Sequence, residues 1–209
     1  MRFFLLLLCC PLLNFAQPLR QKVDYFHGTK QPKVLYHVLK KQKKVWHGPY
    51  QEFYFNDQLK VSGYYFNGQK DSTWVSYTDR GQRKEVRQYR VGQKAGIWLH
   101  FLEGGAVVKR YDQDSGHSLP AALQMDVLIG YPASARAAGL EGQVSGQLHF
   151  KAGCVFDHLE IQTASDPVFA EAARQAYLKA MRLAARYSIP VEGCADGIVP
   201  FTVNFALRN

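Results

Sequence analysis

The sequence lacks the short motifs that mark the common kinds of catalytic site. It contains no H-E-x-x-H motif, no G-x-S-x-G motif, and no glycine-rich loop for a phosphate or a dinucleotide. His149 and His158 flank a predicted hairpin, which is more typical of a surface pair than of a metal site. Asp112 and Asp114 lie where nothing fixes the geometry of two carboxylates. We therefore expect a non-enzymatic protein without catalytic residues, a cofactor or a bound metal.

Long apolar runs are scarce. The run Phe3–Leu13 is interrupted by Pro11 and falls short of the ~20 residues that a membrane-spanning helix needs. It follows the positive start Met1-Arg2 and precedes a small residue, Ala16, which is the layout of a secretory signal. We predict a signal peptide over 1–16 and an exported protein. The alternatives are an uncleaved anchor, or lipidation at one of the two cysteines in this segment, although neither follows the small residue that lipidation usually requires.

Cysteine is also scarce. Of the four cysteines, Cys9 and Cys10 lie in the predicted signal peptide, so cleavage would leave Cys154 and Cys194. Neither has a second ligand nearby at a spacing typical of zinc sites. An isolated pair in an oxidising compartment is most simply a disulfide, which we predict here.

Acidic residues are fewer than basic ones, 17 against 26, so the formal net charge is +9. An exported protein rarely meets nucleic acid, and no recognition-helix pattern accompanies the basic residues, so we expect no nucleic-acid partner. A solvated basic surface is the simplest interpretation. The alternative is attraction to an anionic membrane or polysaccharide. The basic residues form two clusters: Lys40, Lys41, Lys43 and Lys44, then Arg80, Arg83, Lys84, Arg87 and Arg90.

A repeat of 24 residues occupies the first half of the chain. Tyr50, Trp74 and Trp98 keep this spacing, and several other positions keep the same step: Phe53, Tyr77 and Phe101; Tyr65 and Tyr89; Gly68-Gln69-Lys70 and Gly92-Gln93-Lys94. Within a unit, aromatic residues alternate with polar ones, and turn residues such as Asn67-Gly68 and Asp79-Arg80-Gly81 separate the segments. One hairpin cannot bury its aromatic face alone. Successive hairpins are therefore expected to stack into an elongated meander with the repeated aromatics in its core.

The motif G-x-[YW]-x-x-[YF] followed by Y-x-x-G-Q-K resembles MORN-type repeats. The resemblance covers residues 47–111, and a degenerate unit precedes it, so we assign 17–111 to a MORN-like repeat segment. It departs from the pattern at Ser72-Thr73, which replace the usual glycine-centred start, and in a truncated third unit. The resemblance implies a scaffold or an interaction surface, and in some relatives a phospholipid-binding one.

The pattern changes after residue 111. Residues 112–124 begin with polar residues and show no periodicity, so we predict a linker. Residues 125–209 then alternate helix and strand, which predicts an α+β domain with a small antiparallel sheet and helices on one face. Asp166 and Pro167 are suited to begin the longest helix. The predicted elements are a short helix over 133–138, strands over 144–150 and 155–161, a helix over 167–187 and a final strand over 199–207.

The C-terminal segment is similar to the TonB C-terminal family over residues 125–208. The residues that carry the similarity are Tyr131-Pro132-x-x-Ala135, Gly139-x-x-Gly142-x-Val144, the turn from Phe150 to Gly153, Asp166 followed by Ala172-Ala173, and Val199-x-Phe201-x-Val203-x-Phe205. The resemblance implies a periplasmic domain that grips a short peptide of an outer-membrane receptor by strand addition, linked to transport across the outer membrane.

By this resemblance, the final strand is the candidate edge for a protein partner. Its residues are Val199, Phe201, Thr202, Val203, Asn204 and Phe205. The simpler alternative is that this strand only closes the sheet, or that other parts of the chain cover it.

Taken together, these patterns predict a β-hairpin meander followed by an α+β domain, in the periplasm or outer envelope of a Gram-negative bacterium. The leading hypothesis is a protein-binding module whose partner is an outer-membrane TonB-dependent receptor. The chain departs from an energy transducer because nine scattered prolines form no proline-rich spacer and no segment is suited to a permanent membrane helix. The alternative is a basic repeat scaffold that binds anionic lipid or polysaccharide at the envelope.

Overall fold

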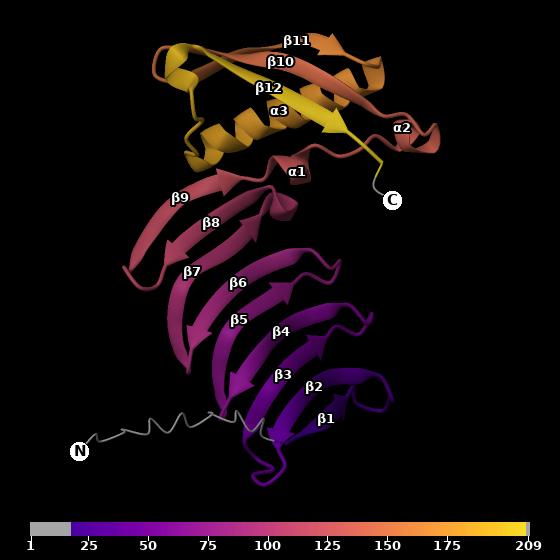
Figure 1. Cartoon of the computed structure of the whole chain (residues 1–209), viewed down its shortest axis with the longest axis vertical. Helices are drawn as coiled ribbons and strands as arrows, with labels where there is room; N and C mark the ends of the chain where they lie inside the picture. The colour runs from indigo at the N-terminus through magenta and orange to yellow at the C-terminus, as the bar shows by residue number, and fades with distance from the viewer. Residues whose placement is uncertain (1–17, 208–209) are drawn as a thin grey trace, which may run out of the picture.

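A computed structural model describes residues 18–207, and the predicted signal peptide over 1–16 lies outside them. Nine strands in the first part each pair antiparallel with the next, in the order β1 to β9. Figure 1 shows them stacked into one long, curved sheet. The strands are β1 Leu19–Tyr25, β2 Pro32–Leu39, β3 Trp46–Phe53, β4 Leu59–Phe66, β5 Gln69–Tyr77, β6 Arg83–Arg90, β7 Gln93–Leu102, β8 Val107–Asp112 and β9 His117–Leu123. The predicted meander is confirmed.

The 24-residue repeat recurs in the hydrogen bonds of the sheet. The indole Nε1 of Trp74 donates to the carbonyl oxygen of Tyr64 at 3.2 Å, and that of Trp98 donates to the carbonyl oxygen of Gln88 at 3.1 Å. The two donors are 24 residues apart in the sequence, and so are the two acceptors. The units therefore share their side-chain geometry as well as their spacing.

The repeated aromatic side chains form a ladder along one face of the sheet, because side chains two residues apart on a strand share a face. Their neighbouring ring centroids lie 4.9–6.4 Å apart. Trp74 is only 5% exposed, but the other rings are half-buried because the α-helices of residues 18–207 all follow β9 and none covers this face (Figure 1). We call these residues the aromatic ladder: Tyr36, Trp46, Tyr50, Tyr65, Trp74, Tyr89 and Trp98.

Gly63 lies beneath the ring of Trp74, and this contact yields a stability prediction. A Cβ atom at Gly63 would lie 2.3 Å from Cδ2 of Trp74. We expect Gly63→Ala to lower the free energy of unfolding by about 1–3 kcal/mol, because the indole must move out of its packed position. Urea unfolding monitored by tryptophan fluorescence measures the change. Gly130→Ala is the control, since nothing lies within 4 Å of a Cβ there. An equal effect of both substitutions would contradict the proposed contact.

The C-terminal part contains a three-stranded antiparallel sheet in the order β11-β10-β12, with α3 packed against it. Its elements are α1 Met125–Leu128, α2 Ala133–Ala137, β10 Gly142–Lys151, β11 Val155–Ala164, α3 Pro167–Tyr187 and β12 Ile198–Phe205. The predicted α+β arrangement is confirmed, and α1 is a short helix that the sequence analysis did not identify.

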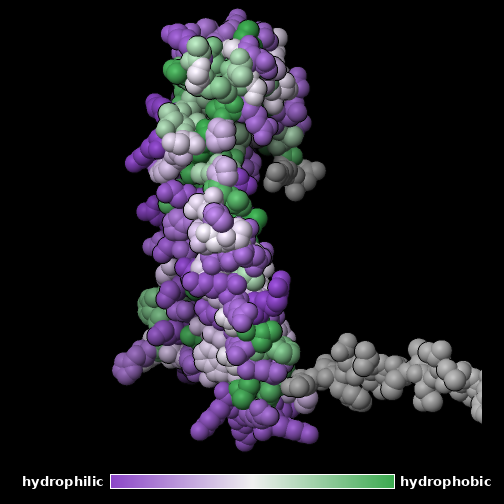
Figure 2. All heavy atoms as spheres, turned by 90° about the vertical axis from the view of Figure 1, so that its left-hand side faces the viewer, coloured by the Kyte–Doolittle hydropathy of each residue, from purple (hydrophilic) through white to green (hydrophobic). Residues whose placement is uncertain are grey.

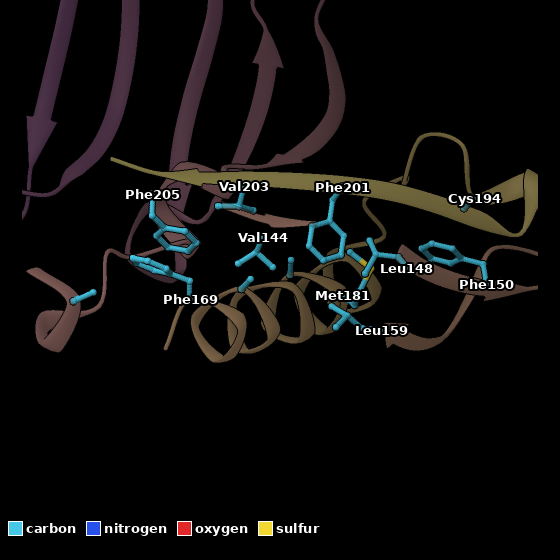
Figure 3. Close-up of a cluster of buried hydrophobic side chains, with 13 residues drawn as sticks. Val144, Leu148, Phe150, Leu159, Phe169, Met181, Cys194, Phe201, Val203 and Phe205 are labelled. Carbon is cyan, nitrogen blue, oxygen red and sulfur yellow. The ribbon is translucent and has the colours of Figure 1, made fainter. Parts of the chain in front are cut away.

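Helix α3 begins and ends where its sequence indicates. The Asp166 carboxylate accepts a hydrogen bond from the Val168 backbone N–H at 2.8 Å, which caps the first turn. Ser188 follows the last turn in a left-handed conformation, with φ of 51°. The helix buries its apolar face against β10 and β12, and Figure 3 shows Phe169 and Phe205 at one end of this core and Phe150 and Cys194 at the other.

The prediction of an irregular linker over 112–124 is wrong. Asp112 ends β8, and β9 pairs with β8 from Asp112↔His117 to Val107↔Leu123. The polar residues between them make a hairpin turn, in which the Asp112 carboxylate accepts hydrogen bonds from the Asp114 N–H and the Ser115 hydroxyl. The backbone is therefore paired despite the weak alternation of its side chains.

The two parts of the chain are joined by packing as well as by covalent connection. Ala106 and Val107 of the meander belong to one buried cluster with Leu183, near the end of α3, and Ile189, which follows the helix. Glu103 also accepts hydrogen bonds from Arg186 at 3.0 Å and from the Tyr187 hydroxyl at 2.8 Å. The end of α3 therefore rests on the last strands of the meander, as Figure 1 shows.

Candidate functional site

Strand β12 occupies an edge of the C-terminal sheet. It pairs with β10 from Gly142↔Phe205 to His149↔Ile198 without a register shift, and β10 lies between it and β11. Phe201, Val203 and Phe205 face the core and are buried, whereas Thr202 and Asn204 are exposed on the opposite face. The structure thus places the six predicted docking residues on a strand whose outer border pairs with no other described strand.

The direction of the backbone hydrogen bonds decides which groups face outward. The N–H of Phe150 donates to the carbonyl oxygen of Gly197 at 2.8 Å, so odd-numbered residues of this strand bond to β10. The even-numbered residues Pro200, Thr202 and Asn204 therefore direct their backbone groups away from β10. Proline has no N–H to donate, so Pro200 on the outward side removes no hydrogen bond between β12 and β10. Thr202 and Asn204 present backbone N–H groups that have no partner among residues 18–207.

A groove of about 850 Å³ lies beside the second half of β12. Its floor and walls combine β12 with the segment around α1 and α2, including Asp126, Tyr131 and Arg136. The Tyr131 hydroxyl donates to the carbonyl oxygen of Leu140, and the Arg136 guanidinium lies 5.7 Å from the Tyr131 ring centroid. These three side chains were not identified as site residues from the sequence, although the Tyr131-Pro132 pair was part of the family resemblance.

The opposite edge of the sheet, β11, is less suited to accept another strand. Its pairing with β10 contains two register shifts, and it carries Asp157 and Glu160 on its exposed side. Bulges and charged side chains are the usual means by which sheet edges resist pairing. By contrast, β12 has no charged residue. The chemistry of the two edges therefore favours β12 as the one open to a partner.

The structure joins Cys154 and Cys194 in a disulfide with a Cα–Cα distance of 5.2 Å. Cys154 lies in the turn between β10 and β11, and Cys194 begins a short turn that leads into β12. The bond therefore links the segment that leads into β12 to the turn between β10 and β11.

The second candidate surface is the aromatic ladder, over which basic side chains are placed. Lys70 Nζ lies 4.3 Å from the Trp74 ring centroid. The guanidinium of Arg87 and the amine of Lys94 lie 5.0 and 5.1 Å from the Trp98 centroid. Lys70 and Lys94 are one repeat apart, so the pattern of cation over indole recurs. The basic cluster Lys40, Lys41, Lys43 and Lys44 is separate from it, in the exposed loop between β2 and β3.

Tyr50 in the ladder provides a pH-dependent test of this packing. Burial of its phenol, with the nearby Glu52 carboxylate, raises the pKa of Tyr50 from 10.0 to about 12. A pKa raised by folding means that stability is fully present below pH ~10 and is lost as the pH rises through the folded value. We expect the free energy of unfolding to fall between pH ~10 and ~12 in the native chain, and to fall less steeply in Tyr50→Phe. Chemical denaturation across this range measures both slopes, and parallel slopes would refute the assignment.

The two histidines that flank the β10–β11 hairpin lie side by side. His149 and His158 stack with ring centroids 4.2 Å apart on the exposed side of the β10–β11 hairpin, next to Glu160. Within residues 18–207, no group of three or more His, Cys, Asp or Glu side chains is placed to hold a metal ion.

Among the same residues, no helix combines the length and the apolar content needed to cross a bilayer. Comparisons with known protein families, curated proteins and solved structures found no match to this chain.

Proposed function

We propose that this chain is an exported, non-enzymatic binding protein whose C-terminal part captures an extended segment of a partner protein along β12. The observation that carries the proposal is the outer border of β12, where Thr202 and Asn204 offer unpaired backbone N–H groups beside a groove. A partner strand would complete this ladder, and its side chains would enter the groove near Tyr131 and Arg136. The disulfide supports an oxidising compartment such as the periplasm.

The resemblance to the TonB C-terminal family supports the same mode and suggests the partner. An outer-membrane receptor with an extended periplasmic segment would supply such a strand. The meander would then act as a spacer or a second contact surface, since Figure 1 shows it extending away from the C-terminal sheet. Its packing against α3 keeps this spacer from moving freely.

A backbone substitution tests the proposal directly. Thr202→Pro removes one outward N–H without removing a bond to β10, so we expect it to abolish partner capture and to leave the melting temperature nearly unchanged. A photo-crosslinking residue at Asn204 would report capture in envelope fractions of the source organism. The control is the same crosslinker at Gln162 on β11. Equal crosslinking from both edges, or crosslinking that persists in Thr202→Pro, would contradict strand addition at β12.

A second candidate function is favoured by the cations placed over the aromatic ladder. Lys70 and Lys94 would attract an anionic membrane or polysaccharide, with the rings of Trp74 and Trp98 as apolar platforms beneath them. Figure 2 shows hydrophilic residues over most of the side of the meander that faces the viewer. Co-sedimentation of the whole chain with anionic vesicles at low and high salt tests this function. Binding that disappears with salt and in Lys70→Glu/Lys94→Glu supports it, and the absence of binding at low salt excludes it.

A further inference from the structure

An apolar pocket lies at the opposite end of the C-terminal core from the groove beside β12. Its volume is about 710 Å³, within the range of ~300–1,000 Å³ typical of small-molecule sites. It is formed by the last turns of α3, the β10–β11 turn and the segment that follows α3. Large apolar side chains that line it include Phe150, Val155, Phe156, Leu178, Met181 and Ile189. Figure 3 shows Phe150 at the end of the core where Cys194 lies, with Met181 nearer the middle.

The mouth of this pocket exposes apolar side chains to solvent. Val155 is 58% exposed and Leu178 is 37% exposed, and both line the pocket. The disulfide partners Cys154 and Cys194 also line it, so the bond holds the turn of the β-hairpin next to the end of α3. The walls are therefore held in place while apolar surface remains open.

One charged side chain lines the pocket. Arg182 is exposed, and it forms no ion pair or side-chain hydrogen bond with any residue between 18 and 207. Arg186, four residues later, is by contrast bonded to Glu103. A guanidinium with unused donors beside an apolar cavity is suited to a carboxylate, which it can bind through two parallel hydrogen bonds.

We propose that this pocket binds a free fatty acid, with the alkyl chain among Phe156, Leu178 and Met181 and the carboxylate on Arg182. An alkyl chain needs no hydrogen-bonding partner. A peptide in the same space would leave its backbone N–H and C=O groups unpaired, because Arg182 and Ser188 are the polar side chains that line it. A bilayer surface would call for a cluster of cations, and the lining holds one. The site does not depend on β12 or on the aromatic ladder.

Isothermal titration of the disulfide-bonded chain from Gln17 to Asn209 with decanoate, laurate and myristate tests the proposal. We expect one saturable site whose affinity rises roughly fourfold for each added methylene, and much weaker binding of dodecanol. Arg182→Gln should weaken laurate binding about ten- to hundredfold, because it removes a charged hydrogen-bond donor. Leu178→Glu should abolish binding, because it places a carboxylate at the mouth that repels the carboxylate of the ligand. The matched controls, Arg174→Gln on the same helix and Ile198→Glu outside the pocket, should bind laurate normally.

Three results would overturn the proposal. The first is the absence of saturable binding, and the second is laurate binding that persists unchanged in both Arg182→Gln and Leu178→Glu. The third is a pocket already occupied by a second copy of the chain, shown by a dimer in sedimentation equilibrium that Leu178→Glu dissociates. Circular dichroism of each variant confirms that a loss of binding does not reflect unfolding.

Discussion

Phe169→Ala is expected to lower the free energy of unfolding of the C-terminal part by about 3–5 kcal/mol. Phe169 is fully buried, and its ring stacks on Phe205 with a centroid distance of 4.5 Å. It also meets the Tyr131 ring edge-on at 5.9 Å. Removing it would leave a cavity between α3, β12 and the segment before α2. The surrounding backbone cannot collapse into this space without breaking the β10–β12 pairing.

Denaturant unfolding monitored by far-ultraviolet circular dichroism measures this change. Leu178→Ala, a partly exposed residue on the same helix, is the control and should shift stability by no more than about 0.5–1 kcal/mol. A loss of less than 1 kcal/mol in Phe169→Ala would show that the Phe169–Phe205 stack is not the centre of this core. Because Phe205 belongs to β12, the same variant should also loosen the strand that we propose as the docking edge.

Removal of the disulfide has the second large expected effect. The bond closes a loop with a sequence separation of 40 residues, and its loss should cost about 4 kcal/mol on the chain-entropy model. Cys154→Ser/Cys194→Ser is therefore expected to lower the stability of the C-terminal part by that amount. The effect arises mainly in the unfolded chain, which gains freedom when the cross-link is removed.

Oxidised and reduced wild-type protein provide the control for the serine variant, since reduction removes the bond without changing the sequence. The serine variant and the reduced wild-type protein should unfold at the same denaturant concentration, which should be lower than that of the oxidised wild-type protein. Thiol titration of the unfolded, non-reduced chain should find no free thiol at Cys154 or Cys194. Two free thiols in protein purified from an oxidising compartment would contradict the pairing.

The regular features of the fold were predictable because they depend on local sequence. Tyr50, Trp74 and Trp98 mark a period that the sheet reproduces in its hydrogen bonds, since each hairpin contains its own turn residues. Asn67 has a φ of 48° and Gly81 a φ of 77°, values that such turns require. The bounds of α3, predicted as 167–187, followed in the same way, with Asp166 and Pro167 marking its start.

Other features could not be read from the sequence because they depend on a neighbouring strand. β9 carries Pro120 and two alanines and alternates weakly, and it forms because the paired edge of β8 lies next to it. β1 pairs with β2 in the same way and was not predicted. The Tyr131 and Arg136 side of the groove was also missed, since these residues meet β12 only after the chain has folded back across about seventy positions.

The sequence by itself determined the two-part architecture, the repeat and the ends of α3, because turn residues, caps and periodicity act over a few positions. It also indicated the strand from Val199 to Phe205 and the pair of cysteines. Only the tertiary structure decided that β12 lies at a border and that Thr202 and Asn204 face outward. Strand order and hydrogen-bond direction are properties of the assembled sheet, and no single strand contains the information that sets them.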